Sequence, residues 1–596
     1  MQQTVSKAPG MGAILKDKVT TFRVWAPHAD QVFVTGDFNK WKEDKDELQH
    51  EENGYWSVSL KKVKEFDEYK FVIINGDQKL VKNDPYALEV TNSDGNSVVR
   101  NFKFEWDNPG FKIPNWNTLV IYELHVGTFN RKNENEVANF KSIIEKLPYL
   151  KSLGINAIEL LPVAEFAGGI SWGYNPAHPF AIEQDYGGPE GFAKLVNEAH
   201  NHGIAVIMDV VYNHFGPSDV DLWQFDGWQE NDKGGIYFYN DYRSKTPWGD
   251  TRPDYGREEV RRYIRDNALM WIELYKCDGL RMDATSYIRY ENGGLGYDSE
   301  IMEGNILMRD INNELRAKHP HILTIAEDLK GESIVTDDSL FGGLHYGSQW
   351  DPKFVHPVRE VLLELDDQHR DLQKIVDAMF AQYSGDVFKR VIYTESHDEV
   401  ANGSARVPEE IQPGEADSIF AKKRAILGMC LTLTTAGIPM IFQGQEFIED
   451  EYFQDTEALD WEKFKAHKGI KRLLSDIIKL RTGETDYCKG LQGQFTEIIH
   501  FNQENKVLAY RRSMNEDFSE STLVVLNFSN QNFEEYRIGV SESQSEILRF
   551  NSNWKGYDDE FSETDVSNLE KEDYGTDYKS NTGVFALPPY GCLLFS

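Results

Sequence analysis

The stretch CDGLRMDATSY, residues 277–287, places an arginine and an aspartate two positions apart in a largely apolar run. If the run is a β-strand, Arg281 and Asp283 share one face, while Leu280 and Met282 point to the other side and can pack on helices. A salt bridge at the end of a buried strand would explain an isolated pair of this kind. Another explanation is needed only if polar residues from other segments converge on the same place.

The sequence around this stretch alternates between two textures. From about residue 110 to 485, short apolar runs alternate with longer amphipathic segments, which is typical of βα units around a parallel sheet. Eight such units predict a closed (β/α)8 TIM barrel, an α/β fold, rather than an open doubly wound sheet. The eight strands are expected at residues 119–125, 156–162, 204–211, 278–284, 322–328, 342–350, 390–398 and 438–445.

The two ends of the chain have a different pattern. Residues 19 to about 105 contain short alternating or β-branched runs separated by Gly, Asn, Asp and Pro, and residues 486–596 return to this texture. Both patterns predict β-sandwiches. The expected domains are 1–108, 109–485 and 486–596. The connection at about 215–255 is too long for a simple βα loop, and loops of that length on a barrel usually carry function.

Composition limits the classes of partner. The chain has 596 residues and a net charge of −35, so nucleic acid or an anionic membrane would be repelled, and neither is expected as a partner. The N-terminus lacks an apolar leader, and the chain lacks a long uninterrupted apolar run, which predicts a cytoplasmic protein. The four cysteines lack CxxC spacing, which argues against a disulfide framework or a zinc site; they are Cys277, Cys430, Cys488 and Cys592.

Polar residues end several of the predicted strands. In a TIM barrel the active site is built at the carboxyl ends of the strands, so such residues would face one mouth. Several carboxylates, an arginine and two histidines at one place would be costly if they served stability alone. The residues concerned are Asp209, Asn213 and His214 after the third strand, Arg281 and Asp283 on the fourth, Glu327 and Asp328 on the fifth, and His397 and Asp398 on the seventh.

Two of these carboxyls suit the chemistry of a retaining glycosidase. That reaction needs a nucleophile and an acid/base roughly 5 to 5.5 Å apart, and neighbouring strands about 4.8 Å apart can supply this spacing. Arg281 can keep Asp283 ionised by direct charge pairing. Because Glu327 and Asp328 alternate, one of them faces the mouth. We expect Glu327, because its longer side chain reaches a leaving-group oxygen more easily.

Four segments carry a resemblance to a known family. DVVYNH, GLRMDA, TIAED and ESHDE, in this order and on these strands, resemble the four signature regions of the α-amylase superfamily, glycoside hydrolase family 13. The N-terminal FRVWAP, GDFNKW and NDPYA are similar to the carbohydrate-binding β-sandwich that precedes the barrel in branching and debranching enzymes. The C-terminal part resembles the family's all-β domain. The resemblance covers essentially the whole chain and implies an α-glucan substrate, such as amylose, glycogen or maltooligosaccharides.

The resemblance also implies roles for individual residues. Asp283 would be the nucleophile, Glu327 the general acid/base and Asp398 the third carboxylate, which stabilises the transition state. Asp209 would support the site from behind. Four side chains would contact or orient the reacting groups: Arg281, which orients the nucleophile, His214 and His397, which hydrogen-bond sugar hydroxyls, and Tyr174 of SWGYNP, which stacks on the sugar at the cleavage point or is an ordinary loop tyrosine.

No metal or cofactor is expected. Asn213 matches a calcium ligand of many α-amylases, but one asparagine is a weak signal, and branching enzymes generally lack that calcium. The sequence has no phosphate-binding glycine loop, which makes a nucleotide-sugar donor a poor fit. In the N-terminal domain, Trp25 or Trp41 could bind glucan, or the domain could be purely structural.

The acceptor in the second half of the reaction distinguishes members of the family. Water gives hydrolysis, and a glucan 6-hydroxyl gives an α-1,6 branch. DATSY lacks the Lys-His pair that follows the nucleophile in typical α-amylases, and ESHD, SHDEV and ALPPYGCLLF resemble branching enzymes. YELHVGTF, YGGPEGF and QWDPKFVH instead resemble maltooligosyl trehalose trehalohydrolase. The sequence favours a 1,4-α-glucan branching enzyme of glycogen biosynthesis. A trehalohydrolase or α-amylase-like hydrolase is the alternative, and a non-catalytic glucan-binding protein the third option.

Overall fold

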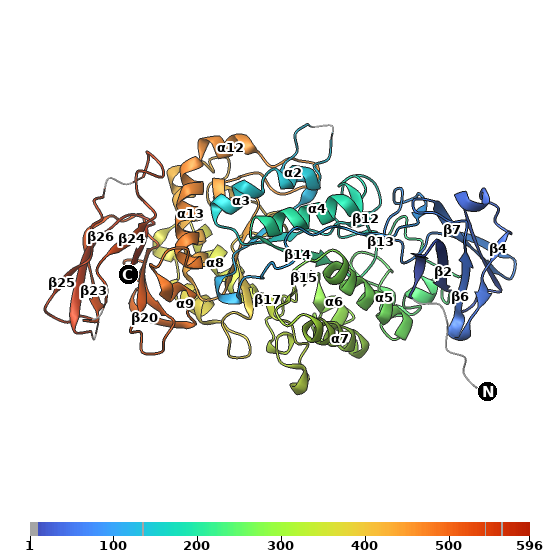
Figure 1. Ribbon diagram of the computed structural model, residues 1–596. Coiled ribbons are helices and arrows are strands. Elements are labelled where there is room, and N and C mark those ends of the chain that lie inside the picture. Colours follow the sequence, from blue (N-terminus) through green and yellow to red (C-terminus); the bar gives the residue numbers. More distant parts are fainter. Residues whose placement is uncertain (1–9, 134–135, 543, 562–563, 578) are drawn as a thin grey trace.

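The computed structural model describes residues 10–133, 136–542, 544–561, 564–577 and 579–596. Figure 1 shows the N-terminal β domain in blue and the C-terminal β domain in red at opposite ends of the molecule, with the helix-covered barrel between them. The predicted fold class is therefore confirmed. No helix or strand of the described residues crosses positions 108–109 or 485–486, and we propose these as the domain boundaries.

The N-terminal domain is a sandwich of two antiparallel sheets. Alternation along the strands buries one face, as at Phe22 and Val24, which point into the space between the sheets. One sheet has the order β1 (Gly12–Lys16), β2 (Val19–Trp25), β6 (Tyr55–Leu60) and β5 (Gln49–His50). The other has the order β4 (Asp46–Glu47), β3 (Gln31–Gly36), β7 (Glu68–Asn75) and β8 (Gln78–Lys82), and β9 (Ser97–Val98) also pairs with β7.

The central domain is a closed parallel barrel, formed by eight strands within the described residues. Each strand lies inside one of the eight predicted ranges, and its residues are buried, as expected when helices cover the outside of a parallel sheet. Ile121 pairs with Met440 and closes the barrel. The strands are β10 (Ile121–Leu124), β11 (Ala157–Leu160), β14 (Ala205–Val210), β15 (Gly279–Met282), β16 (Leu323–Ala326), β17 (Ser348–Trp350), β18 (Arg390–Ile392) and β19 (Ile438–Phe442).

The helices around the barrel follow the apolar periodicity of the sequence. In α4 (Gly188–Asn201), Phe192, Leu195, Val196 and Ala199 form one buried stripe with helical spacing. The other main helices are α2 (Phe140–Ile144), α3 (Leu147–Leu153), α5 (Glu258–Leu269), α7 (Met302–Lys318), α8 (Pro352–Leu363), α9 (Leu372–Phe380), α11 (Ile419–Thr434) and α13 (Lys468–Thr482). Shorter elements are α1 (Val126–Phe129), α6 (Thr285–Arg289), α10 (Val407–Ile411), α12 (Trp461–Ala466) and the hairpin β12 (Ala164–Phe166) and β13 (Pro176–Ile182).

The C-terminal domain is a second sandwich of antiparallel sheets, as predicted. One sheet has the order β20 (Phe495–Asn502), β21 (Val507–Ser513), β22 (Ser521–Asn527), β27 (Cys592–Phe595) and β24 (Leu548–Asn551). The other has the order β23 (Phe533–Val540), β26 (Asn581–Leu587) and β25 (Glu570–Glu572). Within the described ranges, no helix is both long and apolar enough to cross a bilayer.

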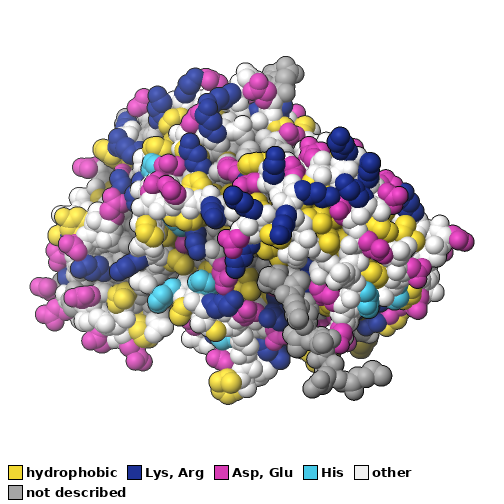
Figure 2. Space-filling model, turned by 45° about the vertical axis from the view of Figure 1, so that its right-hand side comes forward, with side chains coloured by type: hydrophobic (Ala, Val, Ile, Leu, Met, Phe, Trp, Pro, Cys, Tyr) yellow, Lys and Arg dark blue, Asp and Glu magenta, His cyan; other side chains and the backbone are white. Residues whose placement is uncertain are grey.

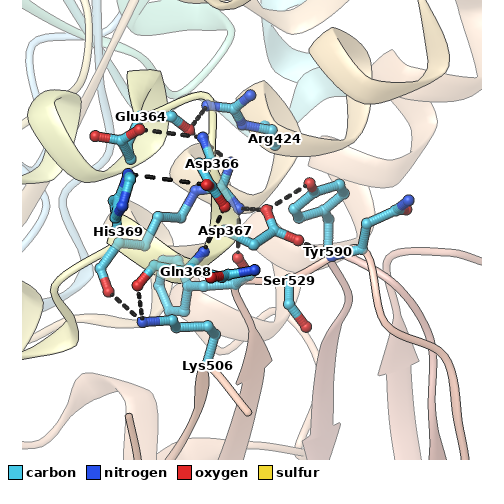
Figure 3. A network of polar contacts seen from close by, with 12 residues as sticks. Glu364, Asp366, Asp367, Gln368, His369, Arg424, Lys506, Ser529 and Tyr590 are labelled. Atoms are coloured by element: carbon cyan, nitrogen blue, oxygen red, sulfur yellow. Dashed lines mark hydrogen bonds and ion pairs between the residues drawn. The ribbon is translucent and has the colours of Figure 1, made fainter. Parts of the chain in front are cut away.

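A polar network joins this domain to the barrel at the segment between α8 and α9, residues 364–370 (Figure 3). The Lys506 ammonium donates to the backbone carbonyls of Gln368 and Arg370 at 2.9 and 2.8 Å. The Tyr590 hydroxyl donates to Asp367 at 2.9 Å. The Lys506 ammonium is buried, and the segment provides its hydrogen-bond partners, so these contacts fix how the domain sits on the barrel.

The two tryptophans that could bind glucan in the N-terminal domain differ in their exposure to solvent. Trp25 is 6% exposed and packs edge-on against Tyr237 of the barrel domain at 5.6 Å, so the hypothesis that it binds glucan is wrong. Trp41 is 38% exposed, and its role in glucan binding stays a prediction.

The acidic residues of the chain do not form one uniform surface on the face shown in Figure 2. Acidic and basic side chains are interspersed there, and hydrophobic side chains occur in small groups.

Candidate active site

A cavity of about 580 Å³ lies where the loops after several barrel strands meet. The sequence predicted seven site residues from four strand ends and one loop, and the structure brings all seven together. Arg281 lies directly behind the cavity and is fully buried. The other six line the cavity: Tyr174, His214, Asp283, Glu327, His397 and Asp398.

Asp283 is held at the end of β15 by hydrogen bonds to both of its carboxyl oxygens. Arg281 donates to Oδ1 at 3.0 Å, as the shared strand face predicted. The Asn213 amide donates to Oδ2 at 2.6 Å and to the Asp283 backbone carbonyl at 3.0 Å. The carboxylate is 8% exposed, so it faces the cavity in one fixed orientation.

Arg281 makes more contacts than the single pair expected from the sequence. Its guanidinium also donates to Asp209 at 2.7 Å and lies 3.1 Å from a carboxyl oxygen of Glu327. The guanidinium lies over the Trp350 ring, 4.4 Å from its centroid. Three carboxyls from three neighbouring strand ends therefore share one buried cation.

Glu327 rather than Asp328 is the carboxyl positioned for chemistry. One Glu327 oxygen accepts the Ala284 backbone N–H at 2.7 Å. Asp328 is instead bonded by Arg289 at 2.8 Å and by the Thr285 hydroxyl at 3.1 Å. Burial, followed by the nearby Asp283 and Asp398 charges, raises the pKa of Glu327 to about 8. Burial is the largest cause of this shift.

Asp398 is open to solvent, unlike Glu327, and it lies beside the buried His397. The Asp398 side chain is 49% exposed, and its carboxylate lies 3.5 Å from Nε2 of His397. Nδ1 of His397 contacts Glu123 at 2.5 Å. Burial lowers the pKa of His397, but the Asp398 and Glu123 charges outweigh it and raise that pKa to about 9. His397 is therefore a cation at neutral pH and can donate to an oxygen in the cavity.

Tyr174 and His214 present rings to the cavity. The Tyr174 ring stacks on His397 with centroids 5.0 Å apart, and its hydroxyl donates to Asp209 at 2.6 Å. His214 stacks on Trp248 with centroids 4.8 Å apart. Burial lowers the pKa of His214 to about 4, so this imidazole is neutral at physiological pH. The roles assigned to these residues from the resemblance stay predictions.

Sequence reasoning missed several residues of the site. Glu123 ends the first barrel strand, in YELH, so the rule that polar strand ends face the mouth could have found it. Trp248, in the 215–255 loop, and Tyr287, in the short helix α6, also line the cavity, and neither segment has a period that marks it as part of the site. Asn213, which matches a calcium ligand of many α-amylases, uses its amide group to donate to Asp283. The described residues contain no group of three or more His, Cys, Asp or Glu side chains that could hold a metal ion.

Comparison with known families matches three parts of the chain to three models. Residues 124–225 and 217–482 match the model described as alpha amylase, catalytic domain. Residues 10–87 match carbohydrate-binding module 48, the isoamylase N-terminal domain. Residues 498–596 match the alpha amylase C-terminal all-beta domain.

Curated relatives match along most of the chain. A 1,4-alpha-glucan branching enzyme of Oceanobacillus iheyensis is 30% identical over 561 residues, 89% of this chain and 86% of that protein. The 1,4-alpha-glucan branching enzyme of Aquifex aeolicus is 30% identical over 555 residues, 88% of this chain and 85% of that protein.

Similar solved structures include two pullulanases. The enzyme of Anoxybacillus sp. LM18-11, complexed with maltotetraose, has a TM-score of 0.76 at 18% identity, over 100% of this chain and 88% of the other. Pullulanase type I of Bacillus subtilis, complexed with maltose, has a TM-score of 0.74 at 20% identity, over 99% of this chain and 86% of the other. At these identities the structures support the fold alone.

Proposed function

The chain belongs to the α-amylase family, and we propose that it is a 1,4-α-glucan branching enzyme, which cleaves an α-1,4 glucan and transfers the released segment to a 6-hydroxyl. The observation that carries the chemistry is the meeting of Asp283, Glu327 and Asp398 in one cavity. The observation that favours branching is the identity of the curated relatives, which are named 1,4-alpha-glucan branching enzymes and match most of the chain.

In the first half of the proposed reaction, Asp283 attacks the anomeric carbon of the bound glucan. Arg281 and Asn213 orient the carboxylate and leave it free to approach from the cavity side. Glu327 is largely protonated at neutral pH and donates its proton to the departing glycosidic oxygen. A glycosyl-enzyme bond forms as the α-1,4 bond breaks.

In the second half, the ionised Glu327 takes the proton from an acceptor 6-hydroxyl as that oxygen attacks the anomeric carbon. The bond to Asp283 breaks and an α-1,6 bond forms, which restores both carboxyls to their starting states. Two inversions retain the α configuration. Asp398 and His397 are placed to contact the sugar ring, and the exposed carboxylate of Asp398 can stabilise positive charge in both transition states.

A neutral glucan suits the electrostatics of the chain better than a charged polymer. The net charge of −35 disfavours a polyphosphate substrate. The cavity combines the stacked rings of Tyr174 and Trp248 with charged and polar groups that can bond hydroxyls. Sugars present both apolar faces and hydroxyl edges, and this lining offers a partner for each.

Proton NMR of amylose after incubation with the enzyme tests the proposal. A branching enzyme produces new α-1,6 linkages with few new reducing ends early in the reaction, and it shifts and weakens iodine staining. A trehalohydrolase or α-amylase-like enzyme would release trehalose or reducing ends in step with substrate loss, and this result would refute the branching assignment. The Asp283→Asn variant, which lacks the proposed nucleophile, is the negative control.

A further inference from the structure

The long loop at 215–255, which follows the third barrel strand, is bound by the N-terminal domain at several points between residues 219 and 237. Asp226 of the loop accepts from the His28 backbone N–H at 3.0 Å and contacts its ring nitrogen at 2.9 Å. The Asn75 amide donates to the Asp226 carbonyl at 2.9 Å. The backbone N–H of Asn83 donates to Asp221 at 2.8 Å. The side chain of Asp226 is completely buried, so its oxygens are held at this interface away from solvent.

Aromatic packing reinforces the same interface. The His28 ring stacks on Trp228 of the loop, with centroids 4.6 Å apart and planes 11° apart. Trp25 meets Tyr237 edge-on at 5.6 Å. Ring contacts and buried hydrogen bonds together hold the loop in one conformation, because moving it would expose both.

The two ends of this loop lie at the active-site cavity. The loop begins directly after His214, and its ends are joined by two hydrogen bonds, from the Phe215 N–H to the Thr251 carbonyl at 3.1 Å and from the Thr251 hydroxyl to the Phe215 carbonyl at 2.5 Å. Between Thr251 and the part bound by the N-terminal domain, the chain turns tightly at residues 246–249. This turn carries Trp248, whose backbone N–H donates to the Thr246 hydroxyl at 3.2 Å.

Trp248 presents an aromatic surface at the edge of the cavity. Its ring lies face-to-face with His214 and edge-on to Tyr287, with centroids 5.1 Å apart in the second pair. The residue is 42% exposed, in contrast to the almost fully buried Asp283 and Glu327. An exposed indole fixed in place by two neighbouring rings is suited to the apolar face of a sugar, because stacking displaces poorly bound water from both surfaces.

We propose that Trp248, supported by His214 and Tyr287, binds a glucose unit of the glucan chain next to the unit that reacts, and that the N-terminal domain serves the reaction by fixing the loop that carries Trp248. The identity of the sugar rests on the proposed function. Trp248 is then a specificity-determining residue, and His28 and Asn75 are positioning residues that act through the loop. The N-terminal domain need not touch glucan to influence binding at the cavity.

Binding measured without turnover tests the role of Trp248. In an Asp283→Asn background, isothermal titration with maltoheptaose should show affinity weakened about 3- to 10-fold by Trp248→Ala, the loss expected for one aromatic contact. Trp248→Phe should retain most of the affinity because a flat ring remains. The control is Trp554→Ala, which removes a 52% exposed tryptophan of the C-terminal domain. Unchanged affinity in Trp248→Ala, with normal folding by circular dichroism, would overturn the proposal.

A second set of variants tests the part played by the N-terminal domain. The double variant His28→Ala/Asn75→Ala should weaken maltoheptaose binding in the same direction as Trp248→Ala, and raise KM for amylose more than it lowers kcat. Combining it with Trp248→Ala should add little further loss, because both changes act on one contact. The control is Lys62→Ala, whose ammonium pairs with Asp46 inside the same domain at 2.8 Å. Full additivity, or unchanged binding in the double variant, would refute the positioning role.

The two proposals fail in different ways. The titrations detect glucan binding whether or not the wild-type enzyme branches. If amylose incubated with wild-type enzyme gains reducing ends and no α-1,6 linkages, the branching assignment fails, and the titrations still decide the role of Trp248. If branching is observed and Trp248→Ala binds glucan normally, only the proposed role of Trp248 in glucan binding is refuted.

Discussion

Replacing Glu327 with glutamine should remove the basic limb of the pH–rate profile together with most of the activity. With a pKa of about 8, the carboxyl is about 90% protonated at pH 7, so the acid form is populated below that pKa and lost as the pH rises through it. Glutamine is nearly isosteric, and its carbonyl can still accept the Ala284 N–H. The fold should therefore survive while the proton donor is lost.

The expected loss follows from what a positioned proton donor contributes. General acid–base catalysis is worth about 10²- to 10⁴-fold, so kcat/KM on amylose should fall by that factor, which corresponds to about 2.7 to 5.5 kcal/mol. The wild type should decline in activity above pH 8, and the residual rate of Glu327→Gln should not decline there. The assay is kcat/KM from pH 5 to 10 in buffers of constant ionic strength.

An activated substrate separates acid catalysis from simple damage to the site. Fluoride leaves an α-maltosyl fluoride without needing protonation, so Glu327→Gln should release a first-turnover burst of fluoride close to the wild-type rate. Asp283→Asn, which lacks the nucleophile, should show no burst. A Glu327→Gln enzyme that keeps the wild-type basic limb, or fails to release fluoride from the activated substrate, would refute the acid role.

Three further outcomes are expected. Asp283→Asn should fold and bind glucan while its turnover falls by several orders of magnitude, because covalent catalysis is lost; retention of most of the rate would show that the nucleophile lies elsewhere. Lys506→Met should lower the free energy of unfolding by about 1 to 3 kcal/mol, measured by urea denaturation, because two hydrogen bonds to carbonyls in 364–370 disappear; an unchanged midpoint would contradict this. Burial raises the pKa of Glu165 to about 9 and that of Glu183 to about 7, so the stability they contribute is complete at acid pH and is lost as the pH rises through those values. In Glu165→Gln the melting temperature should therefore fall less between pH 7 and 9 than in the wild type. The same fall in both proteins would show that Glu165 does not cause it.

The parts of the site that could be predicted are those fixed by strand geometry. Eight apolar runs of strand length give the barrel, and alternation along one strand puts Arg281 beside Asp283, as the 3.0 Å contact shows. Alternation also predicted that only one of Glu327 and Asp328 faces the mouth, and the longer side chain of Glu327 decided the choice between them. These relations are local in sequence, so a single chain without relatives is enough to find them.

The parts that could not be predicted depend on how distant segments meet. Glu123 reaches His397 from the first strand, 274 residues earlier, because closing the barrel brings its first and seventh strands to one mouth. Asn213 follows a strand end, but its amide finds Asp283 only through the turn of its loop. Trp248 lies in a loop that is bound by the N-terminal domain. No spacing rule connects these residues before the chain folds.

The charges around Arg281 explain how neighbouring carboxyls can take different roles. If Asp209, Asp283 and Glu327 were all ionised, one guanidinium would face three buried negative charges, and the two in excess would each cost several kcal/mol. Burial raises the pKa of Asp209 to about 7 and that of Glu327 to about 8, so both carboxyls carry less than a full negative charge near neutral pH and the excess is reduced.

Asp398 lies outside this network, in a different environment. It is half exposed, and the His397 cation that faces it is shared with Glu123. The cation therefore neutralises Asp398 incompletely, and negative charge remains beside the sugar. The transition state of glycosyl transfer resembles an oxocarbenium ion and carries positive charge on that ring. An environment with excess negative charge binds this transition state more tightly than the neutral glucan, which is the condition for lowering the barrier.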